Sequence, residues 1–278
     1  MKINMIKISV PELNKERAKV KTEKRYLESL KQVSLKKSNY IFIDFLWVES
    51  IITLGIKNTQ SIIDSLYRRL NNNFSNICFI NQHISAEKLD WKNGIVFSCH
   101  ANKSNDFISI PHYPKMVSNE FKDREFLFSF MGSFETHYTR ALFDNFKCKE
   151  KFIIKNTGGW HYYNRIKENE INYKDLAVKS IFSLCPRGTG HGTIRLYESL
   201  KSGSIPVIIS DNYKLPVGLE NQVNCIIIPE RDVNKIPDIL IRKKSDVEKL
   251  QLGVKLYAEK YLKDDNFAKT IIENLENI

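Results

Sequence analysis

The sequence predicts an α/β protein made of two Rossmann-like halves, and three observations lead to this fold class. Short runs of β-branched and aromatic residues alternate with longer polar segments of helical character along the chain. The 278 residues, 42% of them hydrophobic, are enough for one large domain or two of ordinary size. The alternation restarts near Glu125, which divides the chain into two cycles.

The first cycle contains five predicted strands, at residues 3–10, 40–45, 76–80, 95–99 and 107–110. Residues 12–36 are highly charged and predict a helix. A second helix is expected after a cap at Thr59 or Ser61, because apolar residues recur from there to Leu70 at helical spacing. We expect this half, residues 1–120, to form an acceptor-side domain.

The second cycle also contains five predicted strands, at residues 126–131, 151–154, 181–184, 205–209 and 223–228. One helix is expected at 136–146, and another at 192–201 that ends at Gly203, since glycine can adopt the left-handed conformation of a helix stop. Residues 121–262 should form the donor domain. Residues 231–277 look helical, and we expect the last segment, 263–278, to be a helix that could pack back on the first domain.

Composition excludes some classes of protein. No apolar run approaches the roughly 18–20 residues needed to cross a bilayer, and residues 1–10 make a poor secretory signal. Five widely spaced cysteines without a metal-ligand pattern favour buried free thiols in a reducing compartment. We therefore expect a cytoplasmic protein, with peripheral contact at the inner face of a membrane left open.

The net charge of +11 fits an anionic membrane surface, an anionic substrate or nucleic acid, and it also fits lysines spread over a solvated surface. The lysines between residues 15 and 37 are interspersed with Glu and Gln, which favours a solvated helix face. No aromatic and basic recognition motif is present, so we do not expect a nucleic-acid partner.

The most informative segment runs from residue 183 to 211. It predicts a buried strand, a glycine-rich turn, a helix, a glycine stop and a second buried strand. Gly188, Gly190 and Gly192 fall within five positions, and glycines let backbone N–H groups approach phosphate oxygens at a helix N-terminus. The loop matches neither a Walker A motif nor the dinucleotide fingerprint, because Thr193 stands where a third glycine would be needed. A phosphate-binding loop and a tight structural turn both remain open.

Two charged residues follow this loop. Arg195 lies in the first helical turn, where a cation is unfavourable against the helix dipole, whereas a bound diphosphate would explain it. Glu198 is three residues further and shares the helix face, so it could accept hydrogen bonds from a ribose or form an ordinary ion pair with Arg195.

The same segment resembles the exostosin-like glycosyltransferases, glycosyltransferase family 47. The resemblance rests on Leu184-Cys-Pro-Arg-Gly188, Arg195-Leu-Tyr-Glu198, Gly203-Ser-Ile-Pro-Val-Ile208 and Ser210-Asp211. Two weaker matches are Asp106-Phe-Ile-Ser-Ile-Pro111 and Phe128-Ser-Phe-Met-Gly-Ser133, the latter followed by Arg140. With Leu215-Pro216, which follows Asp211, the matches cover roughly residues 106–217.

The resemblance implies a GT-B fold, with two Rossmann-like domains facing across a cleft, here in a compact version. It further implies inverting transfer from a nucleotide sugar, a UDP-sugar being favoured, to a hydroxyl of a glycan or lipid-linked acceptor in surface polysaccharide synthesis. Arg195 would hold the donor diphosphate and Glu198 the ribose. The other candidate donor contacts are Arg140, Arg187, Gly188, Gly190, His191, Gly192 and Thr193.

The chemistry needs a stabilised leaving diphosphate and a general base. The sequence contains no Asp-x-Asp, so we expect no metal and no cofactor besides the co-substrate. The candidate bases in the first half are Asp44, Glu49, His83, His100 and His112. Asp44 and His100 are preferred, although His100-Ala101 keeps only half of the family's His-Asp pair. A non-catalytic nucleotide-sugar-binding protein is the alternative.

Overall fold

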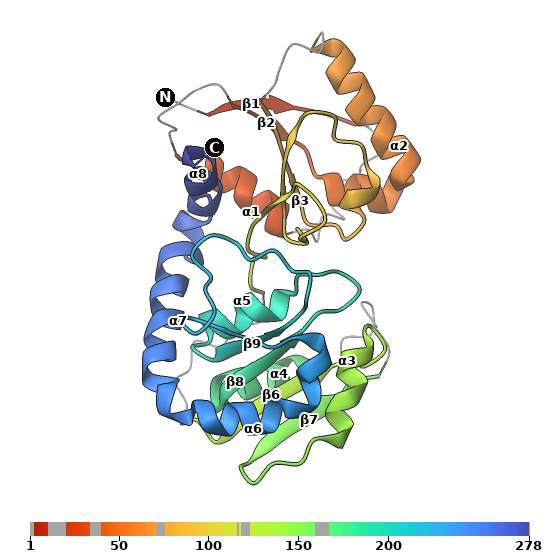
Figure 1. Cartoon of the computed structure of the whole chain (residues 1–278). Helices are drawn as coiled ribbons and strands as arrows, with labels where there is room; N and C mark the ends of the chain where they lie inside the picture. The colour runs from red at the N-terminus through yellow and green to blue at the C-terminus, as the bar shows by residue number, and fades with distance from the viewer. Residues whose placement is uncertain are drawn as a thin grey trace. The chain divides into compact units, whose positions relative to one another are not determined.

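The computed structural model describes residues 3–10, 21–33, 40–70, 76–115, 117, 123–158 and 167–277. The chain forms two compact units (Figure 1). Unit 1 contains residues 1–113, 214–217 and 263–278, and unit 2 contains residues 114–213 and 218–262. Each unit has its own five-stranded parallel sheet, which confirms the predicted α/β class with two Rossmann-like halves.

All ten predicted strands are present. They are β1 (Asn4–Lys7), β2 (Ile41–Asp44), β3 (Ile77–Asn81), β4 (Ile95–Ser98), β5 (Ile108–Ser109), β6 (Phe126–Gly132), β7 (Phe152–Asn156), β8 (Ser180–Pro186), β9 (Ile205–Ile209) and β10 (Ile226–Ile227). The central strands are almost wholly buried, as near-continuous apolar runs in a parallel sheet should be.

The α-helices are α1 (Lys21–Leu30), α2 (Trp47–Arg69), α3 (Tyr138–Ala141), α4 (Lys167–Lys179), α5 (Ile194–Lys201), α6 (Ile236–Arg242), α7 (Val247–Tyr261) and α8 (Lys269–Glu276). Short 3-10 turns cover Ala86–Lys88, Leu142–Asn145, Glu230–Lys235, Lys243–Asp246 and Asp264–Asn266. Among the described residues, no helix has the length and apolar character needed to span a membrane.

Two helices differ from the sequence prediction. The expected start of α2 at Thr59 or Ser61 is wrong, because the helix begins at Trp47 and continues through an interruption at Gly55. Gly55 has φ 78° and ψ 171°, a conformation that glycine adopts easily and other residues rarely do. Helix α4 was not predicted, since its sequence is mostly polar and has little helical periodicity of apolar residues.

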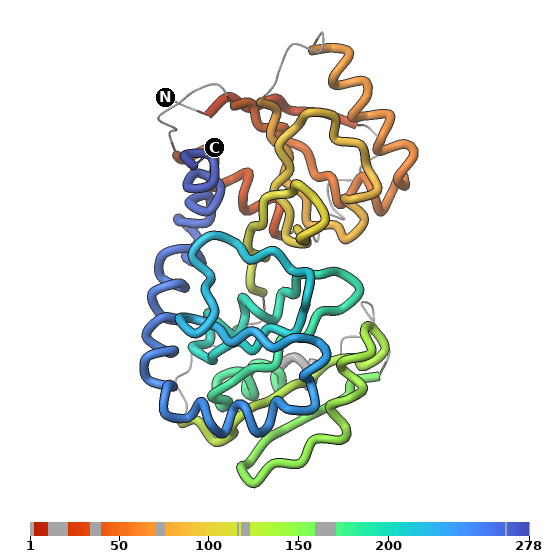
Figure 2. Tube along the Cα trace, viewed as in Figure 1, coloured from red at the N-terminus to blue at the C-terminus, as the bar shows by residue number. Residues whose placement is uncertain are grey.

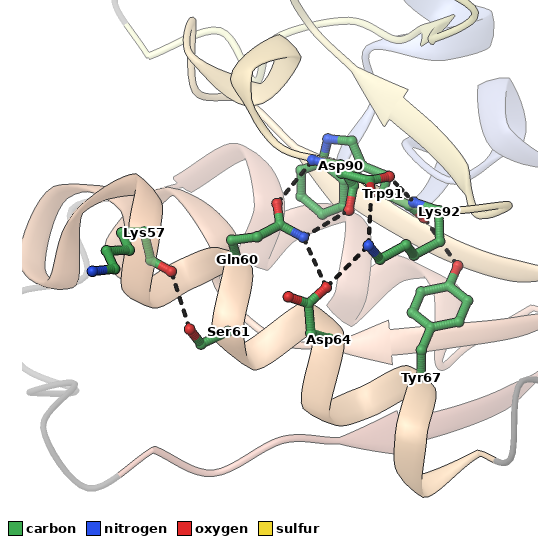
Figure 3. A network of polar contacts seen from close by, with 8 residues as sticks. All are labelled: Lys57, Gln60, Ser61, Asp64, Tyr67, Asp90, Trp91 and Lys92. Atoms are coloured by element: carbon green, nitrogen blue, oxygen red, sulfur yellow. Dashed lines mark hydrogen bonds and ion pairs between the residues drawn. The ribbon is translucent and has the colours of Figure 1, made fainter.

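In unit 1 the five strands lie side by side in the order in which they occur along the chain. The core beside them is aromatic, since the Trp47 ring contacts the rings of Phe79 and Trp91 with centroids 5.4 Å and 5.2 Å away. In the same unit, α2 is tied to the segment before β4 by polar contacts of Gln60 and Asp64 with residues 90 and 92 (Figure 3).

The end of the chain returns to unit 1, where residues 263–277 pack against α1 (Figure 2). The Phe267 ring lies 4.7 Å from the Tyr26 ring, and the backbone N–H of Ala268 donates to Ser29 Oγ over 3.1 Å. These contacts join α1 to the segment before α8, and the hydroxyls of Tyr26 and Thr270, 3.3 Å apart, join α1 to α8 itself.

Unit 2 has the strand order β10-β9-β8-β6-β7. Figure 1 shows α6 and α4 on opposite sides of this sheet, which is the layering of a doubly wound fold. Helix α5 ends as predicted, because Gly203 has φ 72° directly after the helix. The five cysteines are free thiols, of which Cys78, Cys99, Cys185 and Cys225 are buried, which agrees with the sequence analysis.

Candidate functional site

The sheet of unit 2 reverses its winding between β6 and β8. The chain passes from β6 to β7 on one side and then returns to β8 on the other side of β6. In open α/β sheets such a switch point leaves a crevice outside the carboxyl ends of the strands, where ligands bind. The loops that leave this point are those after Gly132 and after Pro186, and the second is the glycine-rich loop. In unit 1 the described strands keep one direction and form no such point.

Arg195 lies at the switch point. Its Nη2 donates a hydrogen bond to the carbonyl oxygen of Met131, at the carboxyl end of β6. The guanidinium is held between two rings, with its carbon 4.6 Å from the Phe130 centroid and 4.8 Å from the Tyr173 centroid. Nε is buried and has no hydrogen-bond partner among the described residues. The side chain is thus fixed by its rings while much of its donor capacity is unused.

Gly132 is required for this placement of Arg195. A Cβ on Gly132 would lie 2.8 Å from Nη2 of Arg195 and 3.1 Å from Cζ of Phe130. The first of these distances is shorter than real Cβ contacts, so any other residue would displace the guanidinium. Glycine is therefore needed at position 132 because the Arg195 side chain approaches its backbone closely, and not because of the backbone conformation there.

Arg140 anchors the two loops of the switch point. It donates to the carbonyl oxygens of Ser133 (3.0 Å), Pro186 (3.1 Å) and Arg187 (2.9 Å). Burial, the largest cause, lowers the pKa of Arg140 to about 9, which leaves the guanidinium charged at neutral pH. We predicted a donor contact for this residue, whereas in the structure three of its N–H groups bind backbone oxygens.

The glycine-rich loop is packed against this anchor. A Cβ on Gly188 would lie 3.2 Å from Nη2 of Arg140, so this glycine also permits a close approach. Arg187 folds over its own loop and donates to the carbonyl oxygens of Gly188 and Thr189. Gly190 and His191 are half-buried, and Gly192 is buried.

Thr193 occupies the N-cap position of α5 in an extended conformation, and its side chain makes no capping hydrogen bond. The first turn of the helix therefore has no side-chain cap. A helix N-terminus without a cap, preceded by glycines, is a site where backbone N–H groups can bind an anion.

Glu198 is buried, with an exposed fraction of 1%. Its Oε2 accepts a 2.7 Å hydrogen bond from the hydroxyl of Tyr173, and its Oε1 accepts one of 3.3 Å from the backbone N–H of Lys115. The sequence left a ribose contact and an ion pair with Arg195 open for this carboxylate. In the structure its two oxygens accept hydrogen bonds from Tyr173 and Lys115.

Tyr173 is the site residue that sequence reasoning missed. It comes from α4, lines a small cavity together with Met131, Ser199 and Arg195, and connects Arg195 to Glu198. Burial raises its pKa well above the ordinary value, so the hydroxyl stays protonated and donates to Glu198. No sequence motif marks Tyr173, because the contact depends on how α4 packs against α5.

The candidate bases lie in unit 1, near the carboxyl ends of its strands. Asp44 ends β2 and forms an ion pair with Lys31, with 2.9 Å between Oδ2 and Nζ. His100 follows β4, and its ring lies against that of His112 with centroids 4.9 Å apart. Burial lowers the pKa of His83, whose Nδ1 accepts a hydrogen bond from the backbone of Ser85. Glu49 is buried in the first turn of α2. The structure thus brings His100 and His112 together.

The protein family of the chain follows from a match to a known family model. Residues 70–243, more than half of it, match the model of the exostosin GT47 domain. The chain belongs to the exostosin GT47 family. This membership confirms the predicted family and the predicted enzyme class, glycosyltransferase, and the matched region extends well before residue 106, where the resemblance seen in the sequence began.

Individual relatives of this exostosin-family chain are distant. The Exostosin-1 homolog of Caenorhabditis elegans is 25% identical over 270 residues, which cover 80% of this chain and 71% of that protein. A probable glucuronoxylan glucuronosyltransferase IRX7 of Arabidopsis thaliana is 31% identical over 125 residues, which cover 43% of this chain but only 27% of that protein.

Among solved structures, the apo form of the lipopolysaccharide outer core galactosyltransferase WaaB is 12% identical to this chain. The match covers 99% of this chain and 100% of that one, with a TM-score of 0.46.

Proposed function

We propose that this glycosyltransferase moves a sugar from a nucleotide-sugar donor to a hydroxyl of a glycan or glycoconjugate acceptor. The observation that carries the proposal is the position of Arg195, beside the uncapped N-terminus of α5 and the glycine-rich loop, at the switch point of unit 2. A guanidinium, backbone N–H groups and a helix dipole are the groups that bind a diphosphate.

In the proposed reaction, the acceptor oxygen forms a bond to the anomeric carbon while the bond from that carbon to the diphosphate oxygen breaks. The electron pair of the broken bond leaves with the diphosphate, and the acceptor proton passes to a base. Attack from the side opposite the leaving group inverts the anomeric centre. Arg195 and the loop would stabilise the charge on the departing diphosphate, and fixed groups of this kind often supply the largest part of catalysis.

We propose that this step needs no metal: Arg195 would compensate part of the negative charge of the leaving group, and the backbone N–H groups of the loop would donate hydrogen bonds to it. The proton would pass to a base in unit 1, for which Asp44 and His100 remain the candidates. His100 is a candidate because histidine has an ordinary pKa suited to proton transfer. The ring of His112 lies beside it, with the centroids 4.9 Å apart.

Glu198 has a positioning role in this proposal. Its carboxylate holds the hydroxyl of Tyr173, whose ring forms one side of the clamp on Arg195. The Glu198 side chain is only 1% exposed, so a ribose contact of the kind that the resemblance implies would first require this carboxylate to become accessible. We therefore expect Glu198 to affect the diphosphate site through Tyr173.

A UDP-sugar is the donor that we propose first, and a glycan or lipid-linked molecule of a surface polysaccharide is the acceptor. Relatives named as probable glucuronosyltransferases support a nucleotide sugar as the donor.

We also propose that the protein is located in the cytoplasm at a membrane surface, on the basis of its net charge of +11 and its free thiols. If the protein only binds nucleotide sugars, it should release no free nucleotide from an intact donor.

The test is a thermal-shift and titration panel of UDP-, GDP-, CMP- and dTDP-sugars on the wild type, Arg195→Ala and Arg195→Lys. We expect one nucleotide class to stabilise the wild type, and its affinity to fall at least tenfold in Arg195→Ala. Arg231→Ala is the matched control, because the Arg231 side chain is 86% exposed in the same unit. Circular dichroism checks folding, and Arg195→Lys keeps the charge without the planar fork. Equal donor affinity in the folded Arg195 variants and the wild type would refute the proposal.

A further inference from the structure

A second group of side chains lies at the same carboxyl edge of the unit 2 sheet. His137 ends the loop after β6 and Tyr138 is the first residue of α3. Asp211 comes directly after β9, and Glu230 begins the 3-10 turn that follows β10. None of the sequence motifs includes Tyr138 or Glu230. The three segments nevertheless bring these residues into contact.

The ring of Tyr138 is exposed and yet held in place. Its exposed fraction is 60%, the highest among the exposed aromatic side chains of the described residues. Its hydroxyl donates to Oε2 of Glu230 over 3.2 Å, and its ring lies 4.6 Å from that of His137. An exposed aromatic ring fixed at its edge presents a rigid apolar face at low entropic cost.

Glu230 is itself fixed by a reciprocal pair of hydrogen bonds with Asp211. The backbone N–H of Asp211 donates to Oε1 of Glu230 over 3.2 Å, and the backbone N–H of Glu230 donates to Oδ1 of Asp211 over 2.9 Å. His137 Nε2 lies 3.7 Å from Oε2 of Glu230. Two carboxylates are therefore placed beside the exposed ring, and they come from two different segments.

This combination suits a sugar ring. A pyranose presents C–H groups on its faces, which pack on an aromatic ring, and hydroxyl donors at its edge, which carboxylates accept strongly. The two carboxylates would repel a diphosphate, for which Arg195 lies at the neighbouring switch point. A pyrimidine base offers few donors to two carboxylates, whereas a hexose offers several.

We propose that Tyr138, supported by Glu230 and Asp211, forms the platform for the transferred sugar of the donor. The inference rests on the proposed function, because it assumes that the diphosphate of the same donor lies at Arg195. It adds the subsite for the sugar itself and makes Tyr138 a determinant of sugar binding.

The experiment is isothermal titration of the wild type, Tyr138→Ala and Tyr138→Phe with UDP and with UDP-glucose, UDP-galactose, UDP-N-acetylglucosamine, UDP-glucuronate and UDP-xylose. We expect the best UDP-sugar to bind about 3–10-fold more weakly to Tyr138→Ala, as loss of a stacked ring predicts, while the affinity for UDP changes less than about twofold. Tyr138→Phe keeps the apolar face and should keep most of the affinity. Ile171→Ala removes another exposed apolar side chain of unit 2 (58% exposed) and is the control.

The outcomes separate the two proposals. If the wild type binds neither UDP nor any UDP-sugar, the proposed UDP-sugar donor fails, and with it the platform. If UDP and the UDP-sugar weaken equally in Tyr138→Ala, the ring serves the nucleotide and the platform for the sugar is wrong. Unchanged binding of the UDP-sugar in Tyr138→Ala would also overturn the platform while leaving the proposed function intact.

Discussion

The hydroxyl of Tyr173 donates a 2.7 Å hydrogen bond to Oε2 of Glu198, and both residues are buried in unit 2. The pair joins α4 to α5, and the ring of the same tyrosine lies against the guanidinium of Arg195. A buried carboxylate requires hydrogen-bond donors, and a half-buried guanidinium is stabilised by an aromatic ring that packs against its face. Tyr173 supplies both, so that the stability of unit 2 and the geometry of the diphosphate site depend on one side chain.

Tyr173→Phe should separate these two contributions. The change removes the hydroxyl that donates to Oε2 of the buried Glu198, and loss of this hydrogen bond to a carboxylate should lower the free energy of unfolding by about 1–3 kcal/mol. The ring that supports Arg195 is kept, so donor affinity should fall less than in Arg195→Ala. Urea denaturation and titration with the donor measure the two effects.

Tyr40→Phe is the control for that variant, because the half-buried Tyr40 side chain makes no hydrogen bond with the described residues. Its free energy of unfolding should stay close to that of the wild type. A Tyr173→Phe variant as stable as Tyr40→Phe would show that Glu198 does not need this donor.

Gly132→Ala should affect the donor more than the fold. The added Cβ would meet Nη2 of Arg195 at 2.8 Å and Cζ of Phe130 at 3.1 Å. The guanidinium would then have to leave the carbonyl oxygen of Met131, which should cost about 1 kcal/mol in stability. Its displacement should weaken donor binding about tenfold, which corresponds to about 1.4 kcal/mol. Titration with the nucleotide sugar and urea denaturation, run on the same preparation, measure both quantities.

Gly55→Ala is the comparison variant, because it should lower stability and leave donor affinity unchanged. Gly55 has φ 78°, and nothing lies within 4 Å of the position that a Cβ would take, so alanine there is strained but not crowded. Because φ 78° with ψ 171° is a conformation that almost only glycine adopts, alanine should cost about 1–3 kcal/mol in unfolding free energy and leave donor affinity unchanged. If Gly132→Ala lost stability in the same way and kept its donor affinity, the close approach to Arg195 would have no part in binding.

Local sequence signals predicted much of this fold. Buried strands are short apolar runs, and the stop of α5 at Gly203 follows from the conformational freedom of glycine, so both can be read from neighbouring residues. Helix α4 could not be predicted in this way, because its residues carry a weak amphipathic pattern and its place is set by packing against the sheet and α5.

In the candidate site, too, features set by neighbouring residues could be predicted and features set by long-range packing could not. Arg195 and the glycine-rich loop could be predicted, since they are adjacent in the sequence and have a recognisable chemistry. The contacts of Glu198 with Tyr173 and Lys115 span 25 and 83 positions, and no motif encodes them. The anchoring role of Arg140 likewise depends on carbonyl groups 46 and 47 positions away.

Glu23 should make unit 1 lose stability as the pH rises. Its carboxyl is buried and accepts hydrogen bonds from the backbone N–H groups of Val48 and Gln82, and burial, the largest cause, raises its pKa from 4.5 to about 8. Between these two pH values the folded chain holds a proton that the unfolded chain has released. The contribution of Glu23 is therefore fully present below about pH 4.5 and is lost as the pH rises towards 8, by at most about 1.4 kcal/mol per pH unit.

Glu23→Gln removes this titration, and urea denaturation at about pH 5.0, 6.5 and 8.0 measures it. The stability of the wild type relative to Glu23→Gln should decrease steadily over this range. Glu28→Gln is the matched control on the same helix, where the side chain is 45% exposed. Parallel pH curves for the wild type and Glu23→Gln would show that the carboxyl has an ordinary pKa.

Gln60 should hold α2 to the segment before β4 through its amide group. Its Oε1 accepts from the backbone N–H of Asp90 over 2.8 Å, and its Nε2 donates to the carbonyl oxygen of Asp90 (3.0 Å) and to Oδ1 of Asp64 (3.1 Å), as Figure 3 shows. Gln60→Ala removes these bonds at a partly solvated site and should lower the free energy of unfolding by about 1 kcal/mol. Gln60→Glu should be more harmful, because it replaces the donor with an oxygen that faces two acceptors. That additional loss is electrostatic and should shrink in about 1 M NaCl, whereas the loss in Gln60→Ala should not.

Ser61→Ala, on the same helix, removes only a bond to Lys57 within the helix and is the control. Urea denaturation at two salt concentrations tests the expectation, and equal losses in Gln60→Ala and Gln60→Glu at low salt would contradict it.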